Sequence, residues 1–216
     1  MKLCFLSSSN GGNFKFFHLA QEKGILRNIE LSLIADRDCR ALEYAIENGI
    51  KHKRIKYRRD YNEELLNTLE EVEPDIIVTT WNKIIDNYTV TKFQGKLINL
   101  HYSLLPAFAG LIGTEPIVKA YERNCQFIGV TCHYVDEGVD TGKIISQAVI
   151  KKDVPIELAI PRIFRMGCLI LLNSILLITN EDLIERRNNS KFNYSPSLLF
   201  NDEIFDEKFW KELEVL

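Results

Sequence analysis

The sequence predicts an α/β protein with a Rossmann-like, mostly parallel sheet and helices on both of its faces. Two observations support this prediction. Short, almost wholly apolar segments, such as residues 2–7 and 76–79, alternate with longer segments of helical periodicity. Apolar runs without in–out alternation are typical of strands that helices cover on both sides. The 216 residues, 46% of them hydrophobic, are enough for one such domain with a well-buried core.

The first half of the chain alternates between strand and helix signals. A turn rich in Ser, Asn and Gly at residues 8–12 leads from the first apolar run into a helical pattern that stops at Gly24. The alternation continues to residue 79, and Gly49 closes the second helix. We therefore expect strands at 2–7, 29–35, 53–56 and 76–79, and helices at 13–24, 39–48 and 61–72.

The second half of the chain predicts strands that extend the parallel sheet in an antiparallel arrangement. Residues 129–135 and 144–150 have alternating faces and are suited to an antiparallel pair. Pro161 must lie in the first turn of the long helix predicted at 157–179, or mark its true start. Its apolar run is only eleven residues long, at 168–178, which favours a buried helix over a membrane span. A further strand at 96–101 and a helix at 114–123 complete the prediction.

Residues 181–216 change in character and predict a separate C-terminal extension after a domain at 1–180. Residues 185–191 form a polar turn region, and residues 201–216 predict a final amphipathic helix. The simplest expectation is that this helix packs on the domain, and the alternative is a contact with a second copy or with the substrate edge. Its apolar side is expected to hold Ile204, Phe205, Phe209, Trp210 and Leu213.

Composition limits the partners and the compartment. The net charge of −3 argues against a nucleic-acid partner, because the basic cluster at 51–59 is short and most simply solvated. Five scattered cysteines without a C-x-x-C pair favour a reduced, cytoplasmic protein without disulfides or zinc. We expect no membrane association, no bound metal, and a monomer or a homodimer. The short apolar start of the chain is a strand rather than a signal peptide.

The most informative residues are an amide, an imidazole and a carboxylate that stand where predicted strands run into loops. Asn99 can donate a hydrogen bond to a developing oxyanion, and His101 can move a proton near neutral pH. Asp140 can hold and charge that imidazole, which would raise the pKa of His101. These three groups are what acyl transfer requires when no Ser or Cys acts as the nucleophile.

The segments that carry these residues closely resemble the formyltransferase family that uses 10-formyltetrahydrofolate. The family signature is Asn-x-His followed by Ser-Leu-Leu-Pro, and then Asp-x-Gly-x-Asp-x-Gly about forty residues later. The resemblance extends over about residues 1–178. It implies that Asn99, His101 and Asp140 are catalytic and that no metal takes part. The matching positions are Asn99, His101, Ser103, Leu104, Leu105, Pro106, Asp136, Gly138, Asp140 and Gly142.

The resemblance also implies binding residues on two further segments. Gly11, Gly12 and Asn13 follow the first strand and match a loop that binds a substrate phosphate in glycinamide ribonucleotide formyltransferases, although Ser9 replaces its first glycine. Lys83 stands at an arginine position of the family, and Gly167 stands where that enzyme carries an acid. The folate is expected to contact Asn82, Lys83, Ile84, Ile85, Asp136, Glu137, Gly138 and Val139.

These features predict an N-formyltransferase that moves the formyl group of 10-formyltetrahydrofolate to a primary amine on a phosphate-bearing small molecule. Glycinamide ribonucleotide is the leading acceptor, and a nucleotide-linked amino sugar is the alternative. A formyltetrahydrofolate hydrolase and a non-catalytic folate- or nucleotide-binding module are the alternatives from other classes. The departures at residues 81–83, 111–116 and 167 bear on the choice of acceptor.

Overall fold

The computed structural model describes residues 1–60, 62–187 and 193–216, and the chain divides into two compact units. Unit 1 consists of residues 1–98, 181–184 and 205–216. Unit 2 consists of residues 99–180 and 185–204. The residues that we expected to form a C-terminal extension therefore contribute to both units.

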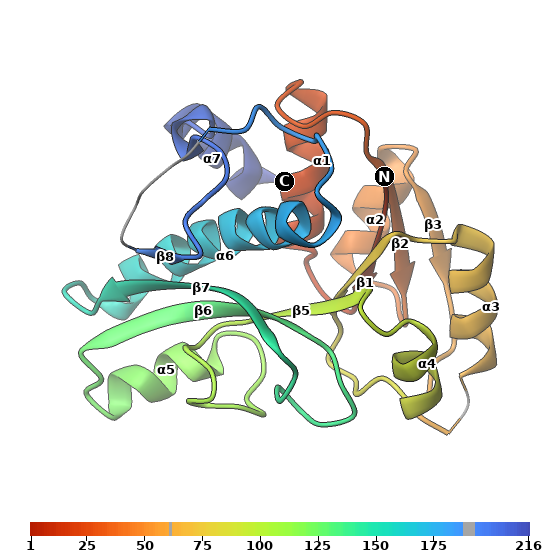
Figure 1. Ribbon diagram of the computed structural model, residues 1–216, viewed down its shortest axis with the longest axis horizontal. Helices are drawn as coiled ribbons and strands as arrows, with labels where there is room; N and C mark the ends of the chain where they lie inside the picture. The colour runs from red at the N-terminus through yellow and green to blue at the C-terminus, as the bar shows by residue number, and fades with distance from the viewer. Residues whose placement is uncertain (61, 188–192) are drawn as a thin grey trace. The chain divides into compact units, whose positions relative to one another are not determined.

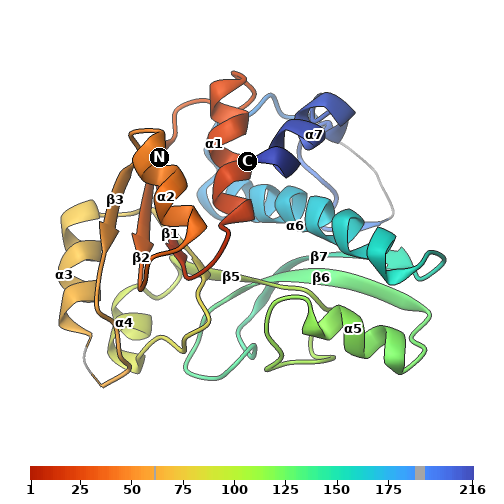
Figure 2. The same ribbon diagram turned by 180° about the vertical axis from the view of Figure 1, so that it is seen from behind.

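Unit 1 is built on a ladder of four parallel strands. Along the ladder they are β3 (Lys51–Arg54), β2 (Glu30–Ala35), β1 (Lys2–Ser7) and β4 (Ile76–Thr80). From Leu3 to Ser7 the central strand is fully buried, because helices cover both faces of the ladder. In Figures 1 and 2, α1 (Gly12–Glu22) and α2 (Arg40–Glu47) lie over one face, and α3 (Glu63–Val72) and α4 (Asn87–Lys92) lie over the other.

An aromatic cluster fixes α1 on the ladder and a second cluster covers its outer side. The ring of Phe5 on β1 lies 5.6 Å from that of Phe14 and 5.5 Å from that of Phe17. On the outer side, Phe16 stacks on Trp210 of α7 (Glu207–Val215) with 5.7 Å between ring centres. The last helix thus packs on the first helix, which agrees with the simplest expectation for the C-terminal residues.

Unit 2 combines the end of β5 (Leu97–His101) with an antiparallel ladder. The ladder consists of β6 (Phe127–Tyr134), β7 (Ile144–Lys151) and the short β8 (Tyr194–Ser195). The long helix α6 (Ile156–Thr179) packs on β6 and β7, while α5 (Glu115–Glu122) is drawn on the other side of β6 (Figures 1 and 2). The strand order of the whole sheet is β3-β2-β1-β4-β5-β6-β7-β8, which confirms the mostly parallel sheet with an antiparallel extension.

The prediction for Pro161 was wrong. The proline lies inside α6, which starts at Ile156, so it is neither in the first turn nor at the start. A proline there removes one helical hydrogen bond. The helix tolerates this loss because its later turns are almost continuously buried, from Met166 to Leu176.

Other elements differ from the prediction mainly at their ends. The final helix begins at Glu207 rather than at residue 201, because the Asp206 side chain caps it by accepting a hydrogen bond from the Phe209 N–H at 2.8 Å. Ile204 precedes the helix and is 44% exposed, so its predicted place on the apolar side was wrong. Helix α4, strand β8 and a short 3₁₀ turn at Asp202–Ile204 were not expected. The predicted helix start at Tyr61, and residues 188–191 of the predicted polar turn, lie outside the described residues.

Helix α6 is long and apolar enough to cross a membrane when only length and composition are considered. Two thirds (67%) of its most hydrophobic window is nevertheless buried inside the protein. Because α6 packs on β6 and β7, this burial is that of a core helix, as the sequence predicted.

Candidate active site

Strand β5 delivers Asn99 and His101 to the same side of unit 2. Side chains two residues apart on a strand share a face, and Leu100 between them points the other way. Leu100 is buried, and its Cδ2 atom lies 3.0 Å from where a side chain at Gly167 of α6 would begin. The side of β5 that faces away from α6 therefore carries the amide of Asn99 and the imidazole of His101.

The loop after β6 supplies the carboxylate of Asp140. Asp140 has a φ of 56°, in the left-handed region that is uncommon for residues other than glycine. Gly142 lets the loop return to the strand, because a Cβ atom there would lie 1.7 Å from the carbonyl oxygen of Tyr134. The glycine in the motif is thus required by close backbone approach, and it fixes where Asp140 can stand.

The three predicted catalytic residues come together. The Nδ1 atom of His101 lies 3.3 Å from Oδ2 of Asp140, and the Asn99 amide nitrogen lies 3.4 Å from Oδ1. The backbone N–H of Gly110 donates to Oδ2 of Asp140 at 2.8 Å. The side chain of His101 is 5% exposed and that of Asp140 is 10% exposed. The three side chains form a nearly buried amide–imidazole–carboxylate cluster.

A fourth residue of the cluster, His133, was missed by the sequence reasoning. Its Nδ1 atom donates to the carbonyl oxygen of Tyr134 at 2.8 Å, so Nε2 can accept from the Asn99 amide at 3.3 Å. The same Nε2 atom lies 3.6 Å from Oδ1 of Asp140. The in–out alternation of β6 already places His133 and Thr131 on one face, and that pattern was the available signal.

Burial lowers the pKa of His101 below its ordinary value of 6.5. The charge of Asp140 and the hydrogen bond to the Phe108 carbonyl act in the opposite direction, while the charge of His133 adds to the lowering. The net shift of the His101 pKa is therefore downward. The contribution of Asp140 has the predicted sign, and the cost of burying a charged ring exceeds it.

Asp140 itself stays ionised. Burial alone would raise its pKa, but the nearby His133 side chain, the hydrogen bond from the Gly110 N–H and the charge of His101 together hold the pKa below the ordinary value of 3.8. A buried carboxylate with several donors is therefore the fixed negative charge of the cluster.

In unit 1, the turn between β1 and α1 has the predicted form of a helix N-terminus without side chains in the way. Gly11 has a φ of 68°, and a Cβ atom there would lie 2.5 Å from the Cβ of Ala41. Gly12 is the first residue of α1, and Asn13 is buried next to it. N–H groups at a helix start are suited to an anion.

The segment 82–85 follows β4 at the same edge of unit 1. The Lys83 ammonium group donates to the Tyr57 carbonyl at 3.1 Å and lies 3.5 Å from the buried carboxylate of Asp36. The Trp81 ring packs against the Tyr57 ring at a tilt, with 4.9 Å between ring centres, and Trp81 is 9% exposed, so it is a core residue. Lys83 thus bridges neighbouring strand ends instead of standing free for a ligand.

In unit 2, the turn 136–139 is closed by its own side chain. Asp136 accepts hydrogen bonds from the Gly138 N–H at 3.1 Å and from the Thr141 hydroxyl at 2.7 Å. Val139 is 46% exposed and Glu137 is exposed. The predicted folate residues Asn82 to Ile85 and Asp136 to Val139 thus belong to different units.

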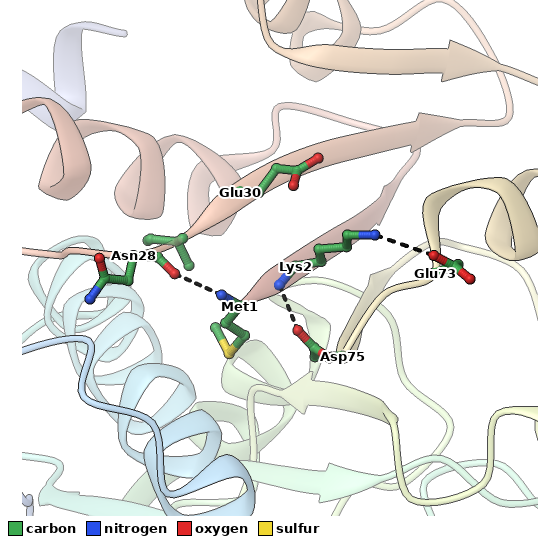
Figure 3. Close-up of a pocket in the computed structure, with 7 residues that line it drawn as sticks. Met1, Lys2, Asn28, Glu30, Glu73 and Asp75 are labelled. Carbon is green, nitrogen blue, oxygen red and sulfur yellow. Dashed lines mark hydrogen bonds and ion pairs between the residues drawn. The ribbon is translucent and has the colours of Figure 1, made fainter.

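An open hollow lies at the other end of the unit 1 strands (Figure 3). It surrounds the starts of β1 and β2 and the approach to β4, whereas the glycine turn follows the carboxyl end of β1. Its polar groups are engaged with one another: the amino group of Met1 donates to the Asn28 carbonyl at 2.8 Å, and Lys2 contacts Asp75 and Glu73. Within the described part of the chain, no three His, Cys, Asp or Glu side chains form a potential metal site.

The family model for formyl transferases matches residues 1–156. The chain belongs to the formyl transferase family. The match contains Asn99, His101 and Asp140, the cluster that unit 2 assembles.

Relatives of this chain have two kinds of activity in their names. This chain is 32% identical over 158 residues to a chloroplastic phosphoribosylglycinamide formyltransferase of Vigna unguiculata. The match covers 69% of this chain and 51% of the relative. The chain is 36% identical over 97 residues to a formyltetrahydrofolate deformylase of Escherichia coli, covering 44% of this chain and 34% of the relative. The matched region thus spans about half or less of the length of these relatives.

Solved structures cover more of this chain. A phosphoribosylglycinamide formyltransferase from Bacillus halodurans has a TM-score of 0.73 at 27% identity, over 84% of this chain and 98% of that one. A deformylase from Pseudomonas syringae has a TM-score of 0.71 over 93% of this chain at 19% identity, which is a likeness of fold alone.

Proposed function

We propose that this formyl transferase moves a formyl group from 10-formyltetrahydrofolate to a primary amine of a phosphate-bearing small molecule, with glycinamide ribonucleotide as the leading acceptor. The observation that supports this most is the cluster of Asn99, His101 and Asp140, whose side chains meet in unit 2 with contacts of 3.3 and 3.4 Å to the carboxylate. The phosphoribosylglycinamide formyltransferases among the relatives and solved structures support the acceptor.

In the proposed mechanism the amine attacks the formyl carbon directly, and each residue has one task. Asn99 donates a hydrogen bond from its amide to the oxyanion that develops on the formyl oxygen. His101 takes part as the proton-moving group, with its Nδ1 atom held by Asp140 at 3.3 Å. Asp140 stabilises the imidazolium that forms when His101 takes up a proton. The proton lost by the amine is then delivered to the folate nitrogen that leaves.

We assign the binding of the two substrates to the remaining predicted residues. Gly11, Gly12 and Asn13 bind the acceptor phosphate, supported by the start of α1, which has no side-chain cap, and by the left-handed Gly11. The folate ring is bound by 82–85, mainly through backbone groups, because Lys83 is engaged with Asp36. Residues 136–139 complete the folate contacts.

The packing of Gly167 bears on the choice of acceptor. A side chain at this position would begin 3.0 Å from Leu100 and 3.3 Å from Tyr102. An acidic residue here would therefore have to displace core side chains, so an acid for the acceptor must come from elsewhere. A nucleotide-linked amino sugar accordingly remains the alternative acceptor.

Hydrolysis of the formyl donor is the second candidate function, because a segment of 97 residues is 36% identical to a formyltetrahydrofolate deformylase. The two functions differ only in the nucleophile, an amine or water. We further propose a cytoplasmic monomer or homodimer without nucleic-acid or membrane partners, with residues 1–180 as its catalytic domain and 181–216 as an extension.

The deciding experiment supplies 10-formyltetrahydrofolate alone, with glycinamide ribonucleotide, and with a nucleotide-linked amino sugar, and follows the folate absorbance. Amine-dependent turnover is expected. Equal turnover with and without amines would assign the protein as a hydrolase. No turnover under any condition, together with measurable folate binding, would leave a binding module.

A further inference from the structure

One loop, residues 102–110 between β5 and α5, touches both members of the His101–Asp140 pair with its backbone. The Nε2 atom of His101 lies 3.0 Å from the Phe108 carbonyl oxygen, and the Gly110 N–H lies 2.8 Å from the Asp140 carboxylate. These two backbone groups are two residues apart in the chain. The position of one short stretch of backbone therefore determines the surroundings of both side chains.

The backbone at Phe108 has an unfavourable conformation. Its φ is 60°, in the left-handed region that bulky residues avoid. Four of the six described non-glycine residues with positive φ are Asn or Asp, which tolerate this region, whereas Phe108 is aromatic. Such a conformation persists only where the surroundings hold it, and held conformations of this kind cluster at functional sites.

Contacts on both sides hold the loop in place. The guanidinium carbon of Arg123, just after α5, lies 5.4 Å from the centre of the Phe108 ring. At the other end of the loop, the Thr131 hydroxyl of β6 donates to the Ser103 carbonyl at 2.7 Å and accepts from the Leu105 N–H at 3.1 Å. These contacts leave the Phe108 carbonyl little freedom to turn away from His101.

We infer that the Phe108 peptide is a positioning element for His101. The Phe108 carbonyl orients the imidazole of His101 and stabilises a proton on its Nε2 atom. The meaning of this for catalysis rests on the proposed function, but the contact itself does not. Because a carbonyl oxygen can only accept, the Nε2 atom that faces it must carry a hydrogen.

Phe108 and Asp140 place one acceptor at each ring nitrogen. A neutral imidazole has a single N–H and can serve only one of them, whereas the protonated ring serves both. Two features destabilise the protonated form of His101: the burial of the ring and the nearby His133. The Phe108 carbonyl offsets part of this destabilisation of the protonated ring. A variant that loses the carbonyl contact should therefore release the proton of His101 at lower pH. During the reaction, the substrate must replace this carbonyl as the partner of Nε2.

A pair of substitutions separates the backbone from the ring. Both Phe108→Val and Phe108→Asn remove the ring and its contact with Arg123. Valine is β-branched and disfavours the left-handed region, while asparagine tolerates it. Only Phe108→Val should therefore move the carbonyl. Phe127→Asn, at a residue on β6 that is 60% exposed, controls for the loss of an aromatic side chain elsewhere in the same unit.

The direct measurement is an NMR titration of the imidazole nitrogens. The protein has four histidines, and His101→Ala identifies the signal of His101. We expect the titration midpoint of His101 to fall in Phe108→Val, and to stay near that of the unchanged protein in Phe108→Asn and Phe127→Asn. The turnover number of Phe108→Val should fall by about 10- to 100-fold, the range for a reacting group displaced by about 1 Å, with a smaller loss in Phe108→Asn.

An unchanged His101 midpoint in folded Phe108→Val would overturn the inference. Equal downward shifts in the Val and Asn variants would also overturn it, by showing that the ring and not the backbone conformation is responsible. If Phe108→Val does not fold, Phe108→Ala takes its place, because alanine also lacks the tolerance of asparagine for this conformation. If no formyl transfer is found with any amine, the proposed function fails, while the titration still tests the contact between Phe108 and His101.

Discussion

Replacing Asp140 by Asn tests whether the carboxylate charge, rather than the shape of the side chain, supports His101. Asparagine has the same size, and its oxygen can still accept from the Gly110 N–H, now 2.8 Å from the carboxylate. With the oxygen in the Oδ2 position, which also faces His101, the amide nitrogen takes the Oδ1 position, where it faces the Asn99 amide and His133. The substitution therefore keeps the backbone anchor and removes the fixed negative charge.

The magnitude follows from one contact. A hydrogen bond to a charged group contributes about 1.5–3 kcal/mol. The 3.3 Å contact between Asp140 and His101 is long for such a bond, which places it in the lower part of this range. At about 1.4 kcal/mol per factor of ten, the lower part of this range corresponds to a fall in the turnover number of about 10- to 40-fold. The acidic limb of the pH–rate profile should also move to lower pH, because the charge of Asp140 raises the pKa of His101.

The assay is the folate absorbance change with the accepted amine, from pH 5 to 9, with folate affinity measured in parallel. Asp153→Asn is the matched control, because Asp153 is an exposed acid of unit 2 that lies 3.9 Å from Arg162. Turnover of Asp140→Asn within about threefold of the unchanged protein would refute the role assigned to the charge.

The same substitution has a signature in stability. The pKa of Asp140 is lowered in the folded protein, so its ionised form stabilises the fold above the unfolded pKa of about 3.9. That contribution is lost as the pH falls through the lower folded-state pKa. The free energy of unfolding of Asp140→Asn should therefore depend less on pH below about 4 than that of the unchanged protein.

Three further predictions concern other parts of the molecule. Asn99→Ala should lower the turnover number by about 10²-fold through a missing oxyanion donor while folate affinity changes far less; equal losses would mean that Asn99 only binds. Gly12→Asp should raise the KM for the acceptor steeply without unfolding the protein, since an acid in the first turn favours a helix, and inorganic phosphate should compete with the acceptor but not with folate; an unchanged KM would make the turn structural. Trp210→Ala should cost about 3–5 kcal/mol in a urea titration, because Trp210 is 6% exposed and stacks on Phe16. A cost below about 1 kcal/mol would show that the last helix contributes little to unit 1.

The sequence was sufficient for the fold class and for the meeting of three catalytic candidates. Near-continuous apolar runs identified the parallel strands, because full burial on both faces leaves no alternation. The sequence placed Asp140 near Asn99 only because both residues match the family motif. The structure gives a physical reason for the glycine of this motif, because a Cβ atom at Gly142 would collide with the Tyr134 carbonyl.

Properties that depend on several distant residues were beyond the sequence. The net pKa shift of His101 is a balance between burial and charges, and burial could not be weighed before the packing was known. The conformation of Phe108 could not be anticipated either, because an aromatic residue does not signal a positive φ. Pro161 was misplaced for a related reason, since the buried later turns of α6 outweigh a local helix-breaking preference.

The packing of Trp210 on Phe16 has a consequence for how the chain is made. Unit 1 is discontinuous, and its first 98 residues leave the ribosome more than one hundred residues before the segment that covers the outer side of α1. At about 5–20 residues per second, the aromatic surface around Phe16 stays uncovered for several seconds during synthesis. A nascent chain in this interval presents an apolar patch of the kind that chaperones bind. A chain stopped before residue 205 would keep that patch permanently, so premature termination late in translation should yield an aggregating product and not merely a shortened protein.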